Sequence, residues 1–117
     1  MNLKLDTDSI RVRMNYDEAI RLVLEGESRE CFPIFSDSLE VCVSPHTKNL
    51  CFVENTNGKS FRLYIPKEKL ETILEAAVKN NNPKKEECEM HDILQIGGRP
   101  IEIRFEVDRF SMRRMGT

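Results

Sequence analysis

The sequence contains no apolar run that approaches the roughly 20 residues needed for a membrane-spanning helix. Its opening residues 1–5 also lack the apolar core of a secretory signal peptide. Neither sign of charge dominates, because 18 Lys and Arg face 20 Asp and Glu, for a net charge of -2. That balance argues against a nucleic-acid binder driven by bulk charge. We therefore expect a cytoplasmic protein that does not contact membranes and is not built to bind nucleic acid.

Several motifs that would carry chemistry are also missing. There is no Cys-x-x-Cys knuckle for zinc, and no glycine-rich phosphate loop leading into a helix, since Gly97-Gly98 is only long enough for a turn. Although His46 could approach a cysteine, no orienting third residue can be named for a thiol nucleophile. We predict no catalytic residue, metal or cofactor, and an enzyme is the less favoured interpretation. The four cysteines are expected to be reduced: Cys31, Cys42, Cys51 and Cys88.

The length of 117 residues suits one domain with one core. Charged residues make up 32% and hydrophobic residues 39%, which is typical of a soluble globular protein. No internal repeat or low-complexity tract is evident. We expect one α+β domain over residues 1–108 and a basic tail over 109–117 that frays. That tail carries Arg109, Arg113 and Arg114, and the last two offer a minor possibility of nucleic-acid contact.

The first third of the chain has clear local patterns. Apolar and basic residues alternate from Ser9 to Met14, as in a half-buried strand. Asn15 and Glu18 then match a capping box, and Gly26 matches the residue that ends a helix. The spacing predicts a helix over residues 16–25.

A second helix is predicted over residues 66–79, because Pro66 suits the first turn and an apolar stripe follows at helical spacing. Residues 84–90 fit either a short helix or a strand. Beyond the Gly97-Gly98 turn, alternation predicts a returning strand through residue 107.

The sequence between the two predicted helices predicts a three-stranded meander, with strands over residues 39–43, 50–54 and 59–65. Asn57-Gly58 is typical of a two-residue hairpin turn, which would place Phe52 opposite Leu63. In the preceding hairpin, a six-residue loop over residues 44–49 would place Val41 opposite Phe52. Cys42 and Cys51 would then be cross-strand neighbours. The element order predicts the α+β class with a mainly antiparallel sheet.

Short motifs across most of the chain resemble a family of small bacterial proteins that forms a domain of unknown function. The matching segments are Ser9-Ile10-Arg11-Val12-Arg13, Asp17-Glu18-Ala19-Ile20 with Gly26, Leu63-Tyr64-Ile65-Pro66-Lys67, and Glu106-Val107-Asp108-Arg109-Phe110. The C-terminal residues 111–117 depart from the acidic tail of that family. The resemblance implies a grouping but no activity.

Arginines on the polar faces of the predicted strands are the candidate anion-binding residues: Arg11, Arg13, Arg62 and Arg104. If the first and last strands were neighbours, these guanidinium groups could bind phosphate oxygens in pairs. The alternative is a solvated sheet face whose ion pairs contribute a few tenths of a kcal/mol each. Their convergence in a hollow would favour the first interpretation.

The outer face of the meander is more apolar than solvent contact requires. Its candidate residues are Cys42, Cys51, Val53 and Tyr64. Either the first helix covers this face or another protein does, and the helix is the favoured cover.

The leading hypothesis is a non-enzymatic protein that acts through protein–protein contacts, as an adaptor, an inhibitor or a dimeric module. The alternative is a binder or hydrolase of phosphorylated small molecules that uses the arginine-rich strand faces.

Overall fold

The computed structural model describes residues 1–34, 37–46, 52–55, 60–79 and 83–109. Its elements follow one another as β1 (Asn2–Leu5), β2 (Ser9–Met14), α1 (Tyr16–Glu25), β3 (Ser28–Ile34), β4 (Asp37–His46), β5 (Phe52–Asn55), β6 (Ser60–Pro66), α2 (Lys67–Lys79), the 3-10 helix η1 (Lys85–Cys88), β7 (Glu89–Ile96) and β8 (Arg99–Val107). The predicted α+β class with two helices is confirmed.

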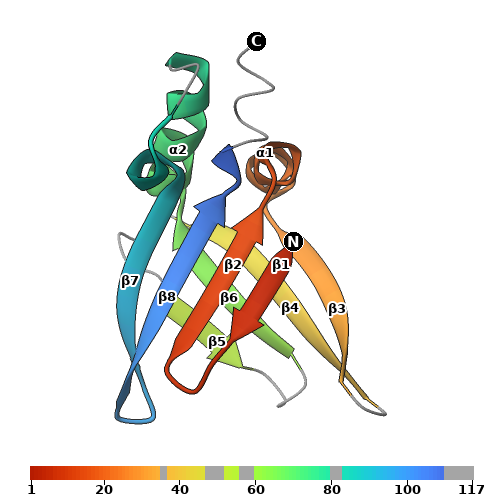
Figure 1. The fold of residues 1–117 in the computed structure, drawn as a ribbon. Coiled ribbons are helices and arrows are strands. Elements are labelled where there is room, and N and C mark those ends of the chain that lie inside the picture. Colours follow the sequence, from red (N-terminus) through yellow and green to blue (C-terminus); the bar gives the residue numbers. More distant parts are fainter. Residues whose placement is uncertain (35–36, 47–51, 56–59, 80–82, 110–117) are drawn as a thin grey trace.

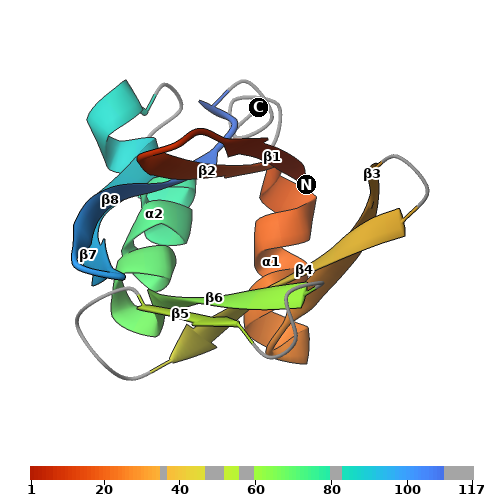
Figure 2. The ribbon, with the colours of Figure 1, turned by 90° about the horizontal axis from the view of Figure 1, so that it is seen from below.

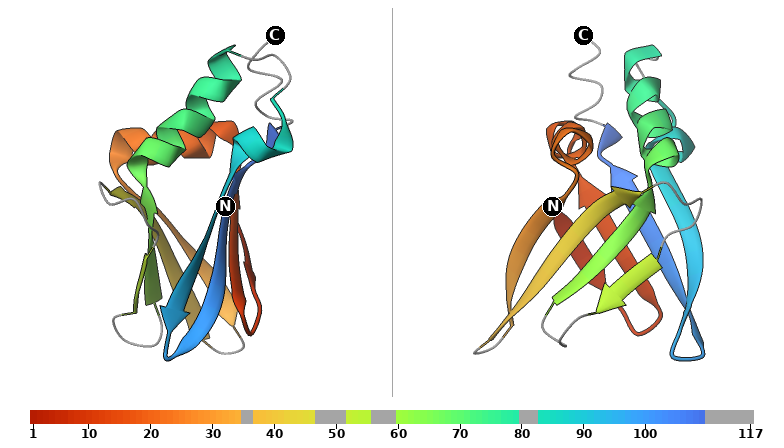
Figure 3. Two further views of the ribbon diagram at one scale, coloured as in Figure 1. Left: turned by 90° about the vertical axis from the view of Figure 1, so that its left-hand side faces the viewer. Right: turned by 180° about the vertical axis from the view of Figure 1, so that it is seen from behind.

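The strands form two four-stranded sheets that face each other (Figure 1). Sheet A has the order β1-β2-β8-β7, and sheet B has the order β3-β4-β6-β5. Both helices lie at one end of the pair, and the turns that join β1 to β2 and β7 to β8 lie at the other end (Figure 3). Viewed from below, α1 and α2 span the space between the two sheets (Figure 2). Four of the six described strand pairings are antiparallel, whereas β2 with β8 and β4 with β6 are parallel.

Helix α1 begins and ends as its sequence predicts. The amide of Glu18 donates to Asn15 Oδ1 at 2.8 Å, and the amide of Asn15 donates to Glu18 Oε1 at 3.1 Å. Gly26 has φ of 80°, and its amide donates to the carbonyl of Leu22 at 3.0 Å, so the residue that ends the helix is in the left-handed region that glycine tolerates best. Local capping chemistry therefore fixes both ends of this helix.

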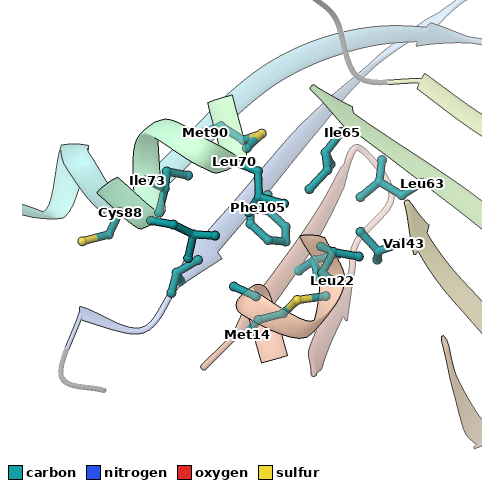
Figure 4. Packing of buried hydrophobic residues seen from close by; sticks show 14 of the residues in the cluster. Met14, Leu22, Val43, Leu63, Ile65, Leu70, Ile73, Cys88, Met90 and Phe105 are labelled. Atoms are coloured by element: carbon teal, nitrogen blue, oxygen red, sulfur yellow. The ribbon is translucent and has the colours of Figure 1, made fainter. Parts of the chain in front are cut away.

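One hydrophobic core joins both sheets and both helices (Figure 4). Sheet A contributes Met14 and Phe105, sheet B contributes Leu63, and the helices contribute Leu22 and Ile73. Since α1 packs into this core between the sheets, it does not cover the outer face of sheet B. The expectation that it would do so is wrong, because its apolar stripe is used inside.

The three strands predicted as a meander all lie in sheet B, but their order differs. Strand β6 lies between β4 and β5, and it pairs with β4 in parallel. This order places β4 and β6, whose buried residues include Val41 and Leu63, together in the middle of the sheet. The short β5 takes the edge, where a few unpaired backbone groups cost least. The strand order therefore follows long-range packing and not the simple succession of hairpins that the meander predicts.

The hairpin register is also shifted by one residue. Phe52 is the Cα partner of Tyr64, and Val53 is the partner of Leu63. Five residues, 56–60, separate the paired Asn55 and Phe61, whereas the predicted two-residue turn leaves an even number. When the number of residues between two paired positions changes from even to odd, the register shifts by one, and each residue of one strand then pairs with residues from the opposite face of its partner. The Asn57-Gly58 turn itself lies outside the described residues.

Residues 84–90, which fitted either helix or strand, contain both. Lys85–Cys88 forms η1, and β7 starts at Glu89. Cys88 is buried, and burial is the main reason that the pKa of its thiol is raised. Residues 110–117 of the expected tail lie outside the part of the chain that the structure describes.

The two halves of the chain have the same architecture, although no repeat is evident in the sequence. Each half is a hairpin, a helix and a second hairpin: β1-β2-α1-β3-β4 and then β5-β6-α2-β7-β8. Exchanging the halves converts the order of sheet A, β1-β2-β8-β7, into β5-β6-β4-β3, which is sheet B. The halves are interlocked, because each sheet takes one hairpin from each half.

The strand registers and burial follow the same exchange. Ser9 pairs with Glu102 in sheet A, and Ser60 pairs with Glu40 in sheet B. Continuing along the strands, Arg11 corresponds to Arg62. Buried residues also correspond: Val12 with Leu63, Met14 with Ile65, Ala19 with Leu70, Leu22 with Ile73, Ile103 with Val41, and Phe105 with Val43. The fold is therefore an internal duplication, and its two outer sheet faces are equivalent positions that carry different residues.

Candidate functional site

The four candidate arginines lie on two faces rather than one. Arg11, Arg13 and Arg104 are on the outer face of sheet A, because β2 and β8 are neighbours and their buried residues point inward. Arg62 is on the outer face of sheet B. The structure thus brings three of the four onto one surface and separates the fourth from them by the thickness of the core.

Ion pairs already engage most of these guanidinium groups. Arg11 Nε donates to Glu106 Oε1 at 2.8 Å, Arg11 Nη2 lies 2.8 Å from the same oxygen, and Glu106 is buried. Arg104 Nη2 lies 3.2 Å from Glu102 Oε1. Arg13 is held more loosely, with Asp108 at 3.7 Å and Glu106 at 4.0 Å. These pairs match the alternative of a charged sheet face, except at Arg13.

Beside Arg13, the outer face of sheet A is hollowed where η1 approaches it. This basic hollow encloses about 260 Å³. Its lining residues are Arg11, Arg13, Lys85, Cys88, Glu89, Glu106, Val107 and Arg109. Four cations and two carboxylates give the lining a formal charge of +2 in a chain of net charge -2. Sequence reasoning missed Lys85 and Arg109, because their approach depends on where η1 and the end of β8 lie.

Arg104 lines a smaller hollow of about 140 Å³ farther along the same face, together with Arg11. Arg104 Nε is buried and has no hydrogen-bond partner among the described residues. The candidate anion residues therefore do not form one four-arginine site.

The outer face of sheet B carries the other candidate surface. Cys42 is 3% exposed and lies between Arg29 and Arg62 in the sheet. It is not a cross-strand neighbour of β5, because β6 lies between β4 and β5. The expected Cys42–Cys51 adjacency depends on the placement of Cys51. Cys51 lies outside the described residues. Val53 is the Cα partner of the buried Leu63, and Phe52 is the partner of Tyr64.

Among the candidates whose side chains the structure describes, Tyr64 is partly exposed, whereas Cys42 is buried. The His46 ring packs edge-on against the Tyr64 ring, with centroids 5.8 Å apart, and the Arg62 guanidinium lies 6.0 Å from its centroid. A shallow hollow of about 370 Å³ adjoins Tyr64, with Arg29, Glu40, Cys42 and Arg62 in its lining. We call the surface made by these residues and the adjoining Glu27 the Tyr64 face. Its members are Glu27, Arg29, Glu40, Cys42, Arg62 and Tyr64.

Charged side chains on the Tyr64 face balance one another. Glu27 Oε2 lies 3.5 Å from Arg62 Nη2 and 3.4 Å from Arg29 Nη2, and Arg29 Nη1 lies 3.5 Å from Glu40. The thiol of Cys42 donates to Glu27 at 3.5 Å. This thiol contact first, and then the two arginines, lower the pKa of the Glu27 carboxyl.

The lowered pKa of Glu27 predicts an acid-sensitive contact. Its ionised form stabilises the folded state above the ordinary carboxyl pKa of 4.5, and that contribution is lost as the pH falls through the folded-state value. Replacing Cys42 by Ala removes the largest cause, so the pKa of Glu27 should rise towards the ordinary value. A carboxyl NMR titration of parent and Cys42→Ala measures both values. An unchanged Glu27 titration in the variant would contradict the thiol contact.

Within the described ranges, no group of three His, Cys, Asp or Glu side chains is placed to hold a metal ion. No described helix is long and apolar enough to cross a membrane. Comparisons with protein-family models, with curated proteins and with solved structures find no match. The resemblance to a bacterial family stays an expectation.

Proposed function

We propose that this protein acts through protein–protein contacts made by the Tyr64 face, and that its partner there is a second copy of the chain. The observation that carries the proposal is that neither α1 nor α2 covers this sheet face in the described part of the chain, because both helices pack into the core between the sheets. A solvent-facing tyrosine flanked by an arginine and a histidine is typical of interface centres, where Tyr and Arg are enriched.

The charges of the Tyr64 face support a second copy as the partner. Among the described side chains of this face, Arg29 and Arg62 balance Glu27 and Glu40, so both signs of charge occur at short range. A two-fold interface brings the same patch against itself, and a mixed patch can then place each arginine opposite a carboxylate. The hollow of about 370 Å³ beside Tyr64 offers room for a side chain from the second copy.

The cytoplasmic location expected from the sequence is part of this proposal. The three described cysteines, Cys31, Cys42 and Cys88, are free thiols, as a reducing compartment would leave them. A dimeric module is the form of the protein-contact hypothesis that this surface favours over an adaptor or an inhibitor.

Replacing Tyr64 by Ala should weaken the dimer strongly. Truncation of a central interface residue costs about 2 kcal/mol or more, which is roughly a thirtyfold rise in the dissociation constant. Sedimentation velocity over a concentration series measures this constant for parent and variant. Circular dichroism should show that the variant remains folded, because Tyr64 lies outside the hydrophobic core.

Ile93→Ala is the matched control, since Ile93 is a large exposed apolar residue on the other sheet. It should leave the dissociation constant unchanged. A parent that stays monomeric at every concentration, or a dimer that Tyr64→Ala and Ile93→Ala weaken equally, would overturn the Tyr64 face as the interface.

A further inference from the structure

A hollow of about 500 Å³ lies between α2 and the beginning of β7, and η1 forms part of its wall. We call it the α2 groove. Its lining includes Glu68, Thr72 and Ile73 from α2, and Glu86, Glu87 and Met90 from η1 and β7. Ile73 and Met90 belong to the hydrophobic core, so the groove has apolar side chains at its base and charged side chains along its walls.

The first half of the chain has an equivalent groove of about 460 Å³ between α1 and the beginning of β3. Helix positions and strand registers relate the lining of one groove to that of the other. Leu22 corresponds to Ile73, Arg21 to Thr72, and Arg29 to His91. The two grooves therefore occupy the same place in the internal duplication and can be compared position by position.

The groove of the first half contains guanidinium groups of the chain itself. Arg21 and Arg29 both line it, and Arg29 Nη2 lies 3.4 Å from Glu27 Oε2. In the α2 groove, Thr72 and His91 stand at the two arginine positions. The α2 groove therefore lacks both guanidinium groups of its counterpart.

Negative charge is greater in the α2 groove. The 3-10 helix η1, which the first half lacks, adds Glu86 and Glu87 to the lining. Four carboxylates and one lysine give the α2 groove a formal charge of -3, whereas three carboxylates and two arginines give the first groove -1. The carboxylates of Glu68 and Glu86 make no ion pair with the described residues. The α2 groove is thus complementary to a cation that comes from outside the chain.

The position of β7 favours an extended peptide as the source of that cation. β7 is an edge strand of sheet A, so one side of its backbone has no strand partner among the described elements. Its first residues, 89–91, line the α2 groove. β7 contains no proline, whereas Pro33 removes one amide donor from the equivalent edge strand β3. An extended segment that adds to a sheet edge places its alternate side chains into neighbouring pockets.

We propose that the α2 groove binds an arginine side chain of a partner protein, presented by an extended segment that pairs with the edge of β7. The guanidinium group donates to the carboxylates of Glu68 on α2 and Glu86 on η1. Its aliphatic stem lies along Thr72, above Ile73 and Met90 at the base of the groove. This partner differs from the second copy proposed for the Tyr64 face, which is on the outer side of sheet B.

The test is an NMR titration at constant low ionic strength with the acetylated and amidated peptide Ala-Val-Arg-Val-Ala. The amide signals of residues 67–73 and 85–91 should shift saturably. A peptide with citrulline in place of arginine has the same shape without the charge and should cause no shift. Free agmatine, which has the guanidinium group and stem but no peptide backbone, should bind about tenfold more weakly or less. Equal affinity for agmatine would assign the groove to a small cation and overturn the peptide partner.

Variants of the groove locate the binding. Glu68→Gln and Glu86→Gln should each raise the dissociation constant about tenfold, and both residues are exposed, so both variants should fold. Glu75→Gln removes an exposed carboxylate of α2 outside the groove, and this matched control should leave the constant unchanged. Thr72→Arg gives the α2 groove the arginine that its counterpart has at Arg21, so this variant should lose peptide binding.

A parent that shows no shift with the arginine peptide, or that binds the citrulline peptide equally, overturns the proposal. So does a dissociation constant that Glu75→Gln raises as much as Glu68→Gln and Glu86→Gln do, because that result describes a general attraction to negative charge. Binding that survives in Thr72→Arg also overturns it. Tyr64→Ala should bind the peptide as the parent does, so failure of the dimer and failure of the α2 groove are separate results.

Discussion

Replacing Phe105 by Ala should lower the free energy of unfolding by about 3–5 kcal/mol. Phe105 is 0% exposed, it is the Cα partner of Val12 in the centre of sheet A, and its ring lies in the shared core (Figure 4). The loss combines the transfer of a large apolar side chain with a cavity that two sheets and two helices cannot fully close. Chemical denaturation with a fitted m-value measures it.

Val78→Ala is the control for this prediction, because Val78 is exposed near the end of α2. It should change stability by no more than about 0.5 kcal/mol. A loss below about 1 kcal/mol for Phe105→Ala would contradict a core that is shared by both sheets.

Features set by neighbouring residues could be predicted from the sequence. The alternation of Ser9 to Met14, the capping box of Asn15 and Glu18, and the left-handed Gly26 each depend on a few adjacent residues. Helix α1 accordingly has the predicted bounds. Strand pairing could not be predicted in the same way, because it depends on which strands bury the most apolar surface together. The parallel pairing of β4 with β6 is a long-range outcome of that kind.

The candidate site was predictable to a similar extent. The sequence indicates which residues share a strand face, and the condition that first and last strands be neighbours is met by β2 and β8. Arg11, Arg13 and Arg104 then fall on one surface. The sheet topology was needed to show that these three arginines lie on a different face from Arg62. The position of η1 was needed to place Lys85 beside them, and no periodicity in the sequence predicts that position.

The internal duplication is not evident in the sequence, and the reason is physical. The halves keep the pattern of buried and exposed positions but few identical residues, since a core accepts Val for Leu or Met for Ile. The offset also changes within the repeat: Val12 corresponds to Leu63, whereas Val41 corresponds to Ile103, across the inserted η1. Both halves bury apolar residues at equivalent positions, whereas their outer faces differ, one carrying the Tyr64 face and the other the basic hollow.

Equivalent helix positions should therefore be equivalent in stability. Leu22 on α1 and Ile73 on α2 lie at the same distance from the start of their helices, and both are buried in the core. Leu22→Ala and Ile73→Ala should each cost about 2–5 kcal/mol, because each leaves a cavity where a helix meets both sheets. Denaturant unfolding of the two variants under identical conditions gives the comparison.

Leu24→Ala completes the comparison. Leu24 lies two residues beyond Leu22 on the same helix but is 77% exposed, so its truncation should change stability by no more than about 0.5 kcal/mol. If Leu22→Ala and Ile73→Ala both exceed 2 kcal/mol while Leu24→Ala does not, each helix closes the core in the same way. If only one of the two buried positions were costly, one helix would be an accessory to a core built without it, and the two halves would not be structural equivalents.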